Sequence, residues 1–178
     1  MDKNNFIDPE KVISQIDLKQ GNVVADFGCG TGYFTFALAK KVGEKGIVYA
    51  LDVLPQIIET IESQAKLDGI KNIITKRVNL EKESGSGLEA DSLDWVILKD
   101  VLYQNQKKDI LLKEAKRVLK KDGRALVIEW KNEDSSIGPM MSLRVEKEEV
   151  LKIAKEGGWI VAEEINAGKV HYCVILIK

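Results

Sequence analysis

Residues 23–34, VVADFGCGTGYF, are the most informative stretch of the sequence. The first part is apolar enough for a buried strand, and glycines follow it at positions 28, 30 and 32. In an open α/β sheet, ligands bind at the carboxyl ends of the strands, where glycines let the backbone approach a ligand and the next helix begin tightly. This stretch therefore predicts a site for a nucleotide-like ligand.

The neighbouring residues narrow the class of ligand. The spacing of Gly28, Gly30 and Gly32 differs from the dinucleotide pattern Gly-x-Gly-x-x-Gly, and no Gly-Lys-Ser/Thr follows as in a phosphate loop. Asp26 would repel a pyrophosphate but would suit an ammonium or sulfonium cation. Asp52, at the end of the next apolar run, is placed to accept hydrogen bonds from both hydroxyls of a ribose. Together these residues fit S-adenosylmethionine.

Outward from this stretch, short apolar runs alternate with segments of helical period, which is typical of an α/β sheet. The last two runs are separated only by Asn-Ala-Gly-Lys, so they predict an antiparallel hairpin. We expect helices at 9–16, 33–42, 55–67, 111–119 and 146–156. We expect strands at 22–27, 47–51, 72–78, 93–98, 125–130, 159–165 and 170–177.

The composition of the chain limits the kinds of molecule that we expect it to bind. The chain has 178 residues and a net charge of -1, so it offers no basic field for nucleic acid. Its two cysteines lie far apart in sequence, which predicts neither a zinc site nor a disulfide framework. The start of the chain is polar, and no apolar run approaches membrane-spanning length. We expect one cytoplasmic domain over residues 1–178, without a metal, nucleic-acid or membrane partner; its oligomeric state stays open.

Several stretches together resemble the class I S-adenosylmethionine-dependent methyltransferases, especially the compact branch of quinone-biosynthesis methyltransferases. They are VVADFGCGTGYF, VYALDV at 48–53, DWVILKDVLY at 94–103, LKEAKRVLKKDGRALVIEW at 112–130 and the closing strand pair. The resemblance implies a Rossmann-like doubly wound sheet of seven strands in the order 3-2-1-4-5-7-6, with strand 7 antiparallel.

The resemblance also implies roles for individual residues. It implies that Asp26 and the glycine loop bind the methionine end of the cofactor, that Asp52 binds the ribose, and that the carbonyl of Lys99 accepts from the cofactor amine. Asn79 stands where many relatives have an aspartate that accepts from adenine, and its amide oxygen can still accept. The implied cofactor-binding residues are Asp26, Gly28, Gly30, Gly32, Asp52, Val53, Asn79, Leu80 and Lys99.

The acceptor side is less defined. Tyr103 stands where close relatives often carry a histidine, and Trp130 follows the fifth strand at the same edge of the sheet, so either residue serves as a substrate wall or as plain packing. His171 is assigned to the substrate side. A structural role, in which other groups satisfy the hydrogen bonds of its imidazole, is nevertheless favoured over a role as general base. If the acceptor holds its proton, the candidate bases are Asp100, Tyr103, Glu129 and His171, and sequence does not choose among them. A helix cap is an equal alternative for Asp100, and no catalytic residue is assigned.

The sequence thus predicts transfer of the sulfonium methyl to a small-molecule acceptor by in-line displacement. A cover built from the first twenty residues, the loop after the fourth strand and residues 131–145 suits a small molecule. Two alternatives stay open: a protein lysine methyltransferase, and a catalytically silent cofactor-binding protein of the same fold. A nicotinamide-dependent oxidoreductase is disfavoured by the glycine spacing, Asp26 and the terminal hairpin. The stretch KDVLY at 99–103 disfavours a nucleobase acceptor, and the two cysteines disfavour arsenite.

Overall fold

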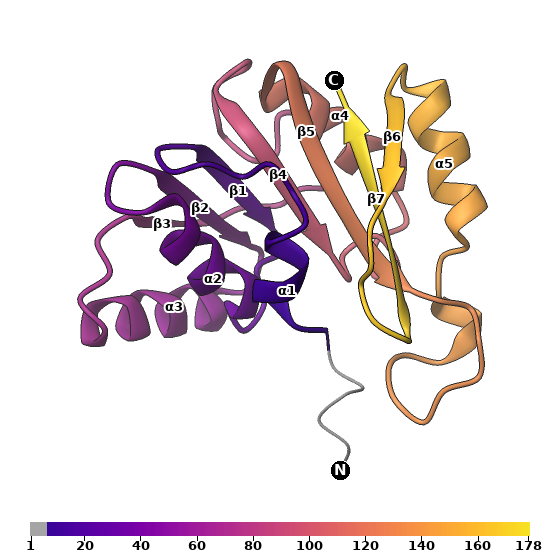
Figure 1. The fold of residues 1–178 in the computed structure, drawn as a ribbon, viewed down its shortest axis with the longest axis horizontal. Coiled ribbons are helices and arrows are strands. Elements are labelled where there is room, and N and C mark those ends of the chain that lie inside the picture. The colour runs from indigo at the N-terminus through magenta and orange to yellow at the C-terminus, as the bar shows by residue number, and fades with distance from the viewer. Residues whose placement is uncertain (1–6) are drawn as a thin grey trace.

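The computed structural model describes residues 7–178, and its centre is a twisted seven-stranded sheet (Figure 1). The strand order is β3-β2-β1-β4-β5-β7-β6, the first five strands are parallel, and β7 runs antiparallel to both neighbours. The predicted Rossmann-like topology is therefore confirmed. The strands are β1 (Val23–Phe27), β2 (Ile47–Asp52), β3 (Ile73–Arg77), β4 (Leu93–Lys99), β5 (Leu119–Trp130), β6 (Ile160–Glu164) and β7 (His171–Ile177).

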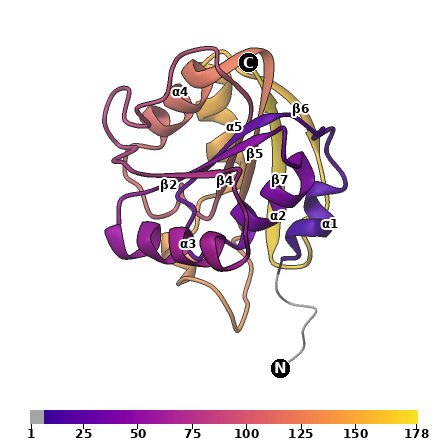
Figure 2. The same cartoon turned by 90° about the vertical axis from the view of Figure 1, so that its left-hand side faces the viewer.

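Helices cover both faces of the sheet (Figures 1 and 2). One face packs against α1 (Pro9–Ile13), α2 (Tyr33–Val42) and α3 (Pro55–Leu67), and the other against α4 (Lys108–Val118) and α5 (Lys147–Glu156). Because both faces are covered, the central strands are mostly apolar on both faces rather than alternating. The predicted helices agree with these bounds except at their ends; α1, for example, stops at Ile13 rather than at residue 16.

The junction of α4 and β5 differs from the prediction. Leu119 was expected in the helix, and the fifth strand was expected to start after an Asp122-Gly123 turn. Instead β5 begins at Leu119, which pairs with Leu93, and the next pair is Trp95 with Arg124. The additional residues form a bulge in which Asp122 has a φ of 62°, so the turn signal marks an irregularity inside the strand.

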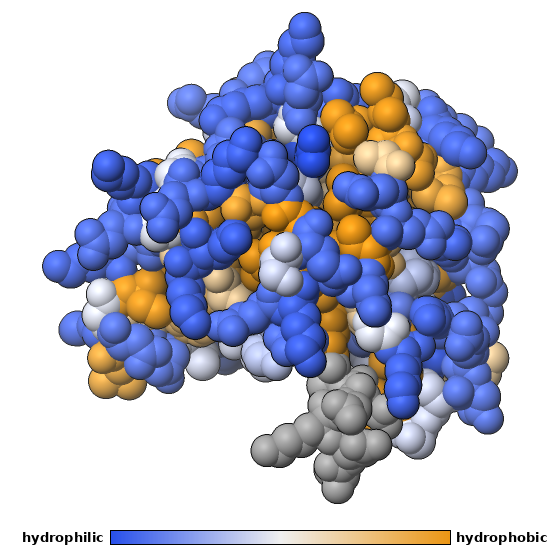
Figure 3. All heavy atoms as spheres, viewed as in Figure 1, coloured by the Kyte–Doolittle hydropathy of each residue, from blue (hydrophilic) through white to orange (hydrophobic). Residues whose placement is uncertain are grey.

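The face shown in Figure 3 is largely hydrophilic, with hydrophobic patches between the hydrophilic residues. Across residues 7–178, none of the helices has the length and apolar character needed to cross a bilayer.

Candidate cofactor site

The glycine loop connects β1 to α2 in a conformation that requires glycine. Gly28, Gly30 and Gly32 have φ values of 71°, 49° and 79°. A Cβ on Gly28 would lie 2.9 Å from Val101 Cγ2, and one on Gly32 would lie 2.8 Å from the Phe36 ring. The loop is fastened to β2 because the amides of Gly28 and Cys29 both donate to the Leu51 carbonyl. It therefore holds its backbone close to the end of β2.

Asp26 is almost fully buried at the end of β1. Its Oδ2 accepts from the hydroxyl of Thr35, the third residue of α2, at 2.6 Å. It therefore does not cap this helix, whose N-cap, Gly32, lacks a side-chain cap bond. Burial raises the pKa of Asp26 to about 6, and the hydrogen bond from Thr35 and the charge of Lys99 oppose this rise. A bound cation near this carboxylate would favour its charged form.

Asp52 ties the glycine loop to the segment after β2. Its Oδ2 accepts from the Gly30 amide at 3.1 Å, and its Oδ1 accepts from the Leu54 amide at 3.0 Å. Each carboxylate oxygen has two lone pairs, so both oxygens can accept a further hydrogen bond. Val53 and Leu54, both about half exposed, add apolar surface beside this carboxylate.

These residues border one cavity of about 540 Å³ at the carboxyl ends of β1, β2 and β4. Such a volume is ordinary for a small-molecule site. Of the predicted cofactor-binding residues, only Gly32 does not line it, and it ends the loop at the start of α2. Asn79 lines the cavity and uses one lone pair of its Oδ1 to accept from the Glu81 amide. The structure thus brings the predicted set together.

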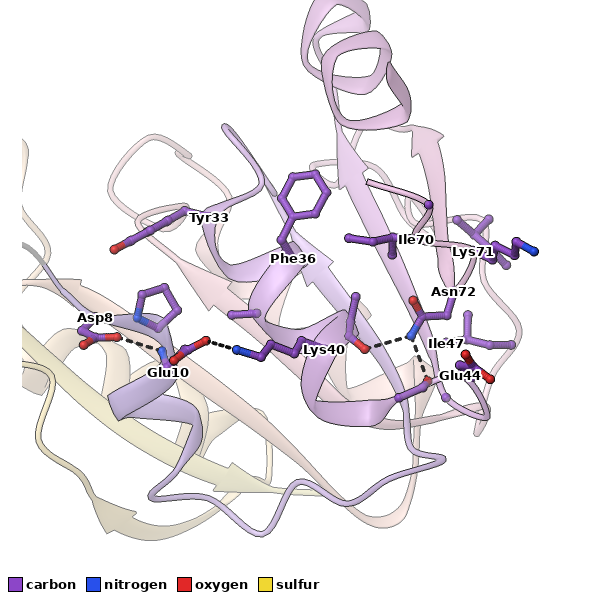
Figure 4. A pocket seen from close by; sticks show the side chains of 17 residues that line it. Asp8, Glu10, Tyr33, Phe36, Lys40, Glu44, Ile47, Ile70, Lys71 and Asn72 are labelled. Carbon is purple, nitrogen blue, oxygen red and sulfur yellow. Dashed lines mark hydrogen bonds and ion pairs between the residues drawn. The ribbon is translucent and has the colours of Figure 1, made fainter. Parts of the chain in front are cut away.

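A larger cavity, about 1240 Å³, lies elsewhere (Figure 4). It runs along the outer side of α2, where Tyr33, Phe36 and Lys40 point toward it, and it reaches the amino ends of β2 and β3 at Ile47 and Asn72. Ligands of open α/β sheets bind at the carboxyl ends of the strands. The smaller cavity, about 540 Å³, is therefore the candidate site despite its size, and we call it the cofactor cavity.

Asp100 follows β4 and lines the cofactor cavity. Its φ is 55°, its amide donates to the Ile128 carbonyl at 2.9 Å, and Lys99 pairs with its Oδ2. No helix begins here, since α4 starts at Lys108, so the helix-cap alternative for Asp100 is wrong. The Asp100 carboxylate lies where the end of β4 meets β5 and the start of β7.

His171 begins β7 and is 2% exposed. Its Nε2 lies 3.3 Å from Asp100 Oδ1, yet neither ring nitrogen makes a hydrogen bond to any residue in 7–178. The expectation of a satisfied structural histidine is therefore wrong. The ring packs against Trp130, its partner across the β5–β7 ladder, with the ring centroids 4.1 Å apart and the ring planes tilted by 40°.

Glu129 is fully buried on the other face of β5. Its Oε1 accepts from the Leu102 amide at 2.6 Å and so holds the loop after β4, while its Oε2 has no partner among the described residues. Burial raises its pKa to about 8, and the negative charge of Asp100 adds to this rise. Within residues 7–178, these carboxyl and imidazole groups are not arranged as a metal site.

The predicted substrate-side residues do not all share the cofactor cavity. Tyr103 lines it, whereas Trp130 and His171 do not. His171 instead lines a second cavity, about 440 Å³, between the end of β5, the start of α5 and the β6–β7 turn. Cys29 lines the cofactor cavity, but burial raises its thiol pKa, so it stays a neutral thiol.

Sequence reasoning missed Arg144, which organises the loop after β5. Its guanidinium is largely buried and lies 5.8 Å from the centre of the Trp130 ring. Gly138 also packs against this ring, so closely that a Cβ added to Gly138 would lie 2.6 Å from a ring atom. Arg144 donates to the Ser135 hydroxyl and to the carbonyls of Lys131, Glu133, Ile137 and Pro139. The sequence around it has no period, so no signal pointed to this role.

The sheet is Rossmann-like, and beside its glycine loop lies a carboxylate-lined cavity of a size that suits a nucleoside. These features are typical of proteins that bind a nucleoside cofactor. A family model described as a methyltransferase domain matches residues 18–172. A crystal structure of a SAM-dependent methyltransferase from Aquifex aeolicus matches with a TM-score of 0.89 and 30% identity, over 97% of this chain and 90% of that one. The chain belongs to the S-adenosylmethionine-dependent methyltransferases, and the predicted resemblance is confirmed.

Two curated relatives are similar over part of their length. A demethylmenaquinone methyltransferase of Lactobacillus johnsonii is 30% identical over 67% of this chain and 48% of its own length. An aklanonic acid methyltransferase of Streptomyces sp. strain C5 is 36% identical over 43% of this chain and 34% of its own. The chain spans about half the length of the first of these relatives.

Proposed function

We propose that this protein moves the sulfonium methyl of S-adenosylmethionine to a small-molecule acceptor by in-line displacement. The observation that carries the proposal is a single cavity lined by Asp26 and Asp52 and also by Asp100 and Tyr103. One cavity of this kind can hold a cofactor and present its methyl group to a second molecule.

The cavity fits the cofactor in size and in charge. A nucleoside with a cationic amine and sulfonium needs acceptors and carboxylates rather than the basic residues of a phosphate site. In this proposal the buried Asp26 and the Lys99 carbonyl bind the methionine end, Asp52 binds the ribose, and Val53 and Leu80 flank the adenine. The raised pKa of Asp26 supports this placement, because a neighbouring cation stabilises a carboxylate that burial destabilises.

The bound cofactor supplies an electrophilic methyl group, and the chain supplies alignment and a site with little water. Tyr103 and Asp100 border the cavity beyond Lys99, which leaves the acceptor to approach from the loop after β4. Of the cover expected from the sequence, only the loop after β4 lines this cavity; Asp8–Glu10 and Lys131–Glu133 line other cavities, and residues 1–6 lie outside the described residues. The relatives named for a menaquinone precursor and for aklanonic acid support a small organic acceptor.

Binding is tested first. S-adenosylhomocysteine should raise the melting temperature, because a ligand at a hundredfold excess over its dissociation constant stabilises the folded state by about 2.7 kcal/mol. NADH serves as the control and should have no effect. No shift at millimolar S-adenosylhomocysteine would reject the cofactor site, and a shift with NADH alone would favour an oxidoreductase.

Transfer is tested with radiolabelled S-adenosylmethionine and fractionated extract of the source cells. We expect label in the small-molecule fraction. Label only in protein would favour the lysine methyltransferase alternative, and cofactor binding without label in any fraction would favour a silent binding protein.

A further inference from the structure

We propose that the ammonium group of Lys99 binds the carboxylate at the methionine end of S-adenosylmethionine. This inference rests on the proposed function, and it adds a role for the Lys99 side chain to the role of the Lys99 carbonyl. It implies a site that requires the complete amino-acid end of the cofactor, including its carboxylate.

The charges around the cofactor cavity favour this pairing. Among the described residues that line it, Asp26, Asp52, Glu81 and Asp100 are acidic, and Lys99 is the only basic one. The methionine end of the cofactor carries two cations, the amine and the sulfonium, and one anion, the carboxylate. The acidic residues can balance the cations, whereas the anion needs a positive partner, because an unpaired charge in a partly buried site is strongly destabilising. Within the described lining, Lys99 offers that partner.

The amides of the glycine loop already have partners within the chain. Those of residues 28–30 donate to the Leu51 carbonyl and to Asp52 Oδ2, and the Gly32 amide donates to the Cys29 carbonyl. A ligand carboxylate bound to any of these amides would have to displace an oxygen of the protein. A side-chain cation is therefore favoured over the glycine loop as the partner of the cofactor carboxylate.

The position of Lys99 suits a ligand that ends in an amino acid. Asp26 pairs with Ile97 across the β1–β4 ladder, and residues two apart in a strand share a face, so Asp26 and Lys99 lie on the same face of the sheet. The charge of Lys99 also opposes the rise in the pKa of Asp26, so the two groups lie within electrostatic reach. The amine and the carboxylate of an amino acid are bonded to one carbon atom, so their partners must lie close together. Asp26 for the amine and Lys99 for the carboxylate meet this condition.

Lys99 can bind this carboxylate without losing its present partner. Its ammonium pairs with Asp100 Oδ2, and 27% of its side-chain surface is exposed. An ammonium has three N–H donors, so it can bind Asp100 and a second carboxylate together. Lys99 lines the cofactor cavity and neither of the other two cavities described above. Its side chain is therefore accessible to a ligand in the cofactor cavity.

A purely structural role for Lys99 makes a different prediction. If Lys99 only balanced the charge of Asp100, its replacement would affect every ligand of the cavity to a similar extent. If Lys99 binds the cofactor carboxylate, the effect is restricted to ligands that carry this group. Two ligands that differ only in this carboxylate therefore separate the two roles.

The test is a cycle of calorimetric titrations with S-adenosylhomocysteine and with S-adenosyl-3-thiopropylamine, which keeps the amine and lacks the carboxylate. The unchanged protein should bind S-adenosylhomocysteine about 10- to 100-fold more tightly than the analogue, the range expected for a hydrogen bond between charged groups. In Lys99→Met this affinity ratio should fall to within about threefold of one, because the cycle isolates the pairwise interaction. A ratio near one in the unchanged protein, or an unchanged ratio in Lys99→Met, would overturn the proposal.

Two further variants control for charge and for folding. Lys99→Arg keeps the positive charge and should keep most of the ratio; a ratio as low as that of Lys99→Met would contradict the argument from charge. Lys113→Met on α4, where the side chain is 79% exposed, is the matched control and should have the ratio of the unchanged protein. Binding of the analogue shows that Lys99→Met folds. If Lys99→Met binds neither ligand, the ratios of the unchanged protein and of Lys99→Arg decide.

The same titrations distinguish this inference from the proposed function. If the unchanged protein binds neither ligand, the proposed function fails. If it binds both ligands equally, or if the preference for S-adenosylhomocysteine persists in Lys99→Met, the cofactor site stands and only the role of the Lys99 side chain fails.

Discussion

Glu129 makes the stability of this protein depend on pH in a direction that is unusual for a carboxylate. Its pKa rises from 4.5 to about 8 on folding, chiefly through burial. Between these values the folded state keeps a proton that the unfolded state has lost, so stability is present below pH 4.5 and falls as pH rises through 8. Linkage from these two pKa values gives a loss of stability on the order of 2 kcal/mol between pH 6.5 and 8 as an upper bound.

Glu129→Gln should remove this loss. Glutamine mimics the protonated acid, and its Oε1 can still accept from the Leu102 amide. The assay is urea denaturation of both proteins at half-unit steps from pH 6.5 to 8, a window chosen because Asp26, with a pKa of about 6, has largely ionised there. Glu163→Gln, an exposed change on β6, is the control and should keep the wild-type slope. Parallel curves for the unchanged protein and Glu129→Gln would refute the argument that Glu129 is buried in its neutral form.

Three further perturbations test the site and its supports. Asp52→Ala should weaken S-adenosylhomocysteine binding about 30-fold in calorimetry, since a charged acceptor is worth roughly 2 kcal/mol, while the exposed control Asp68→Ala should not change it. Gly28→Ala should destabilise the fold by about 2 kcal/mol or more in urea, because φ is positive and Val101 lies 2.9 Å from the new Cβ; adding Val101→Ala should relieve the contact but not the backbone strain. Arg144→Lys should speed hydrogen exchange in residues 131–139, since lysine cannot donate to five acceptors at once; unchanged exchange would show that this loop is held by other contacts.

The sequence was informative where local chemistry and burial act together. Strands covered on both faces are mostly apolar on both of them, and the glycines after β1 cannot be replaced without a clash or a strained φ. Both features can therefore be recognised in the sequence. Asp26 and Asp52 stand at the ends of adjacent parallel strands, β1 and β2, whose carboxyl ends meet at one edge of the sheet. The cofactor side of the cavity therefore followed from sequence order.

The α4–β5 junction shows where local signals mislead. Asp122-Gly123 reads as a turn between elements, but the pairing of Leu119 with Leu93 extends β5 backwards past it. The ladder to β4 satisfies the backbone hydrogen bonds on both sides of the bulge, and this gain depends on a strand about 25 residues away in the chain.

The α/β class and the residues around the glycine loop could be predicted from the sequence, and the family resemblance added the strand order. Which of the four candidate bases lie close together depends on how the chain folds. Asp100 and His171 are 71 positions apart, and they come together because β7 runs antiparallel to β5 and sets His171 beside Trp130, next to the end of β4. Contacts of this kind depend on strand register and on the left-handed backbone of one residue, Asp100, and neither leaves a periodic pattern in the sequence.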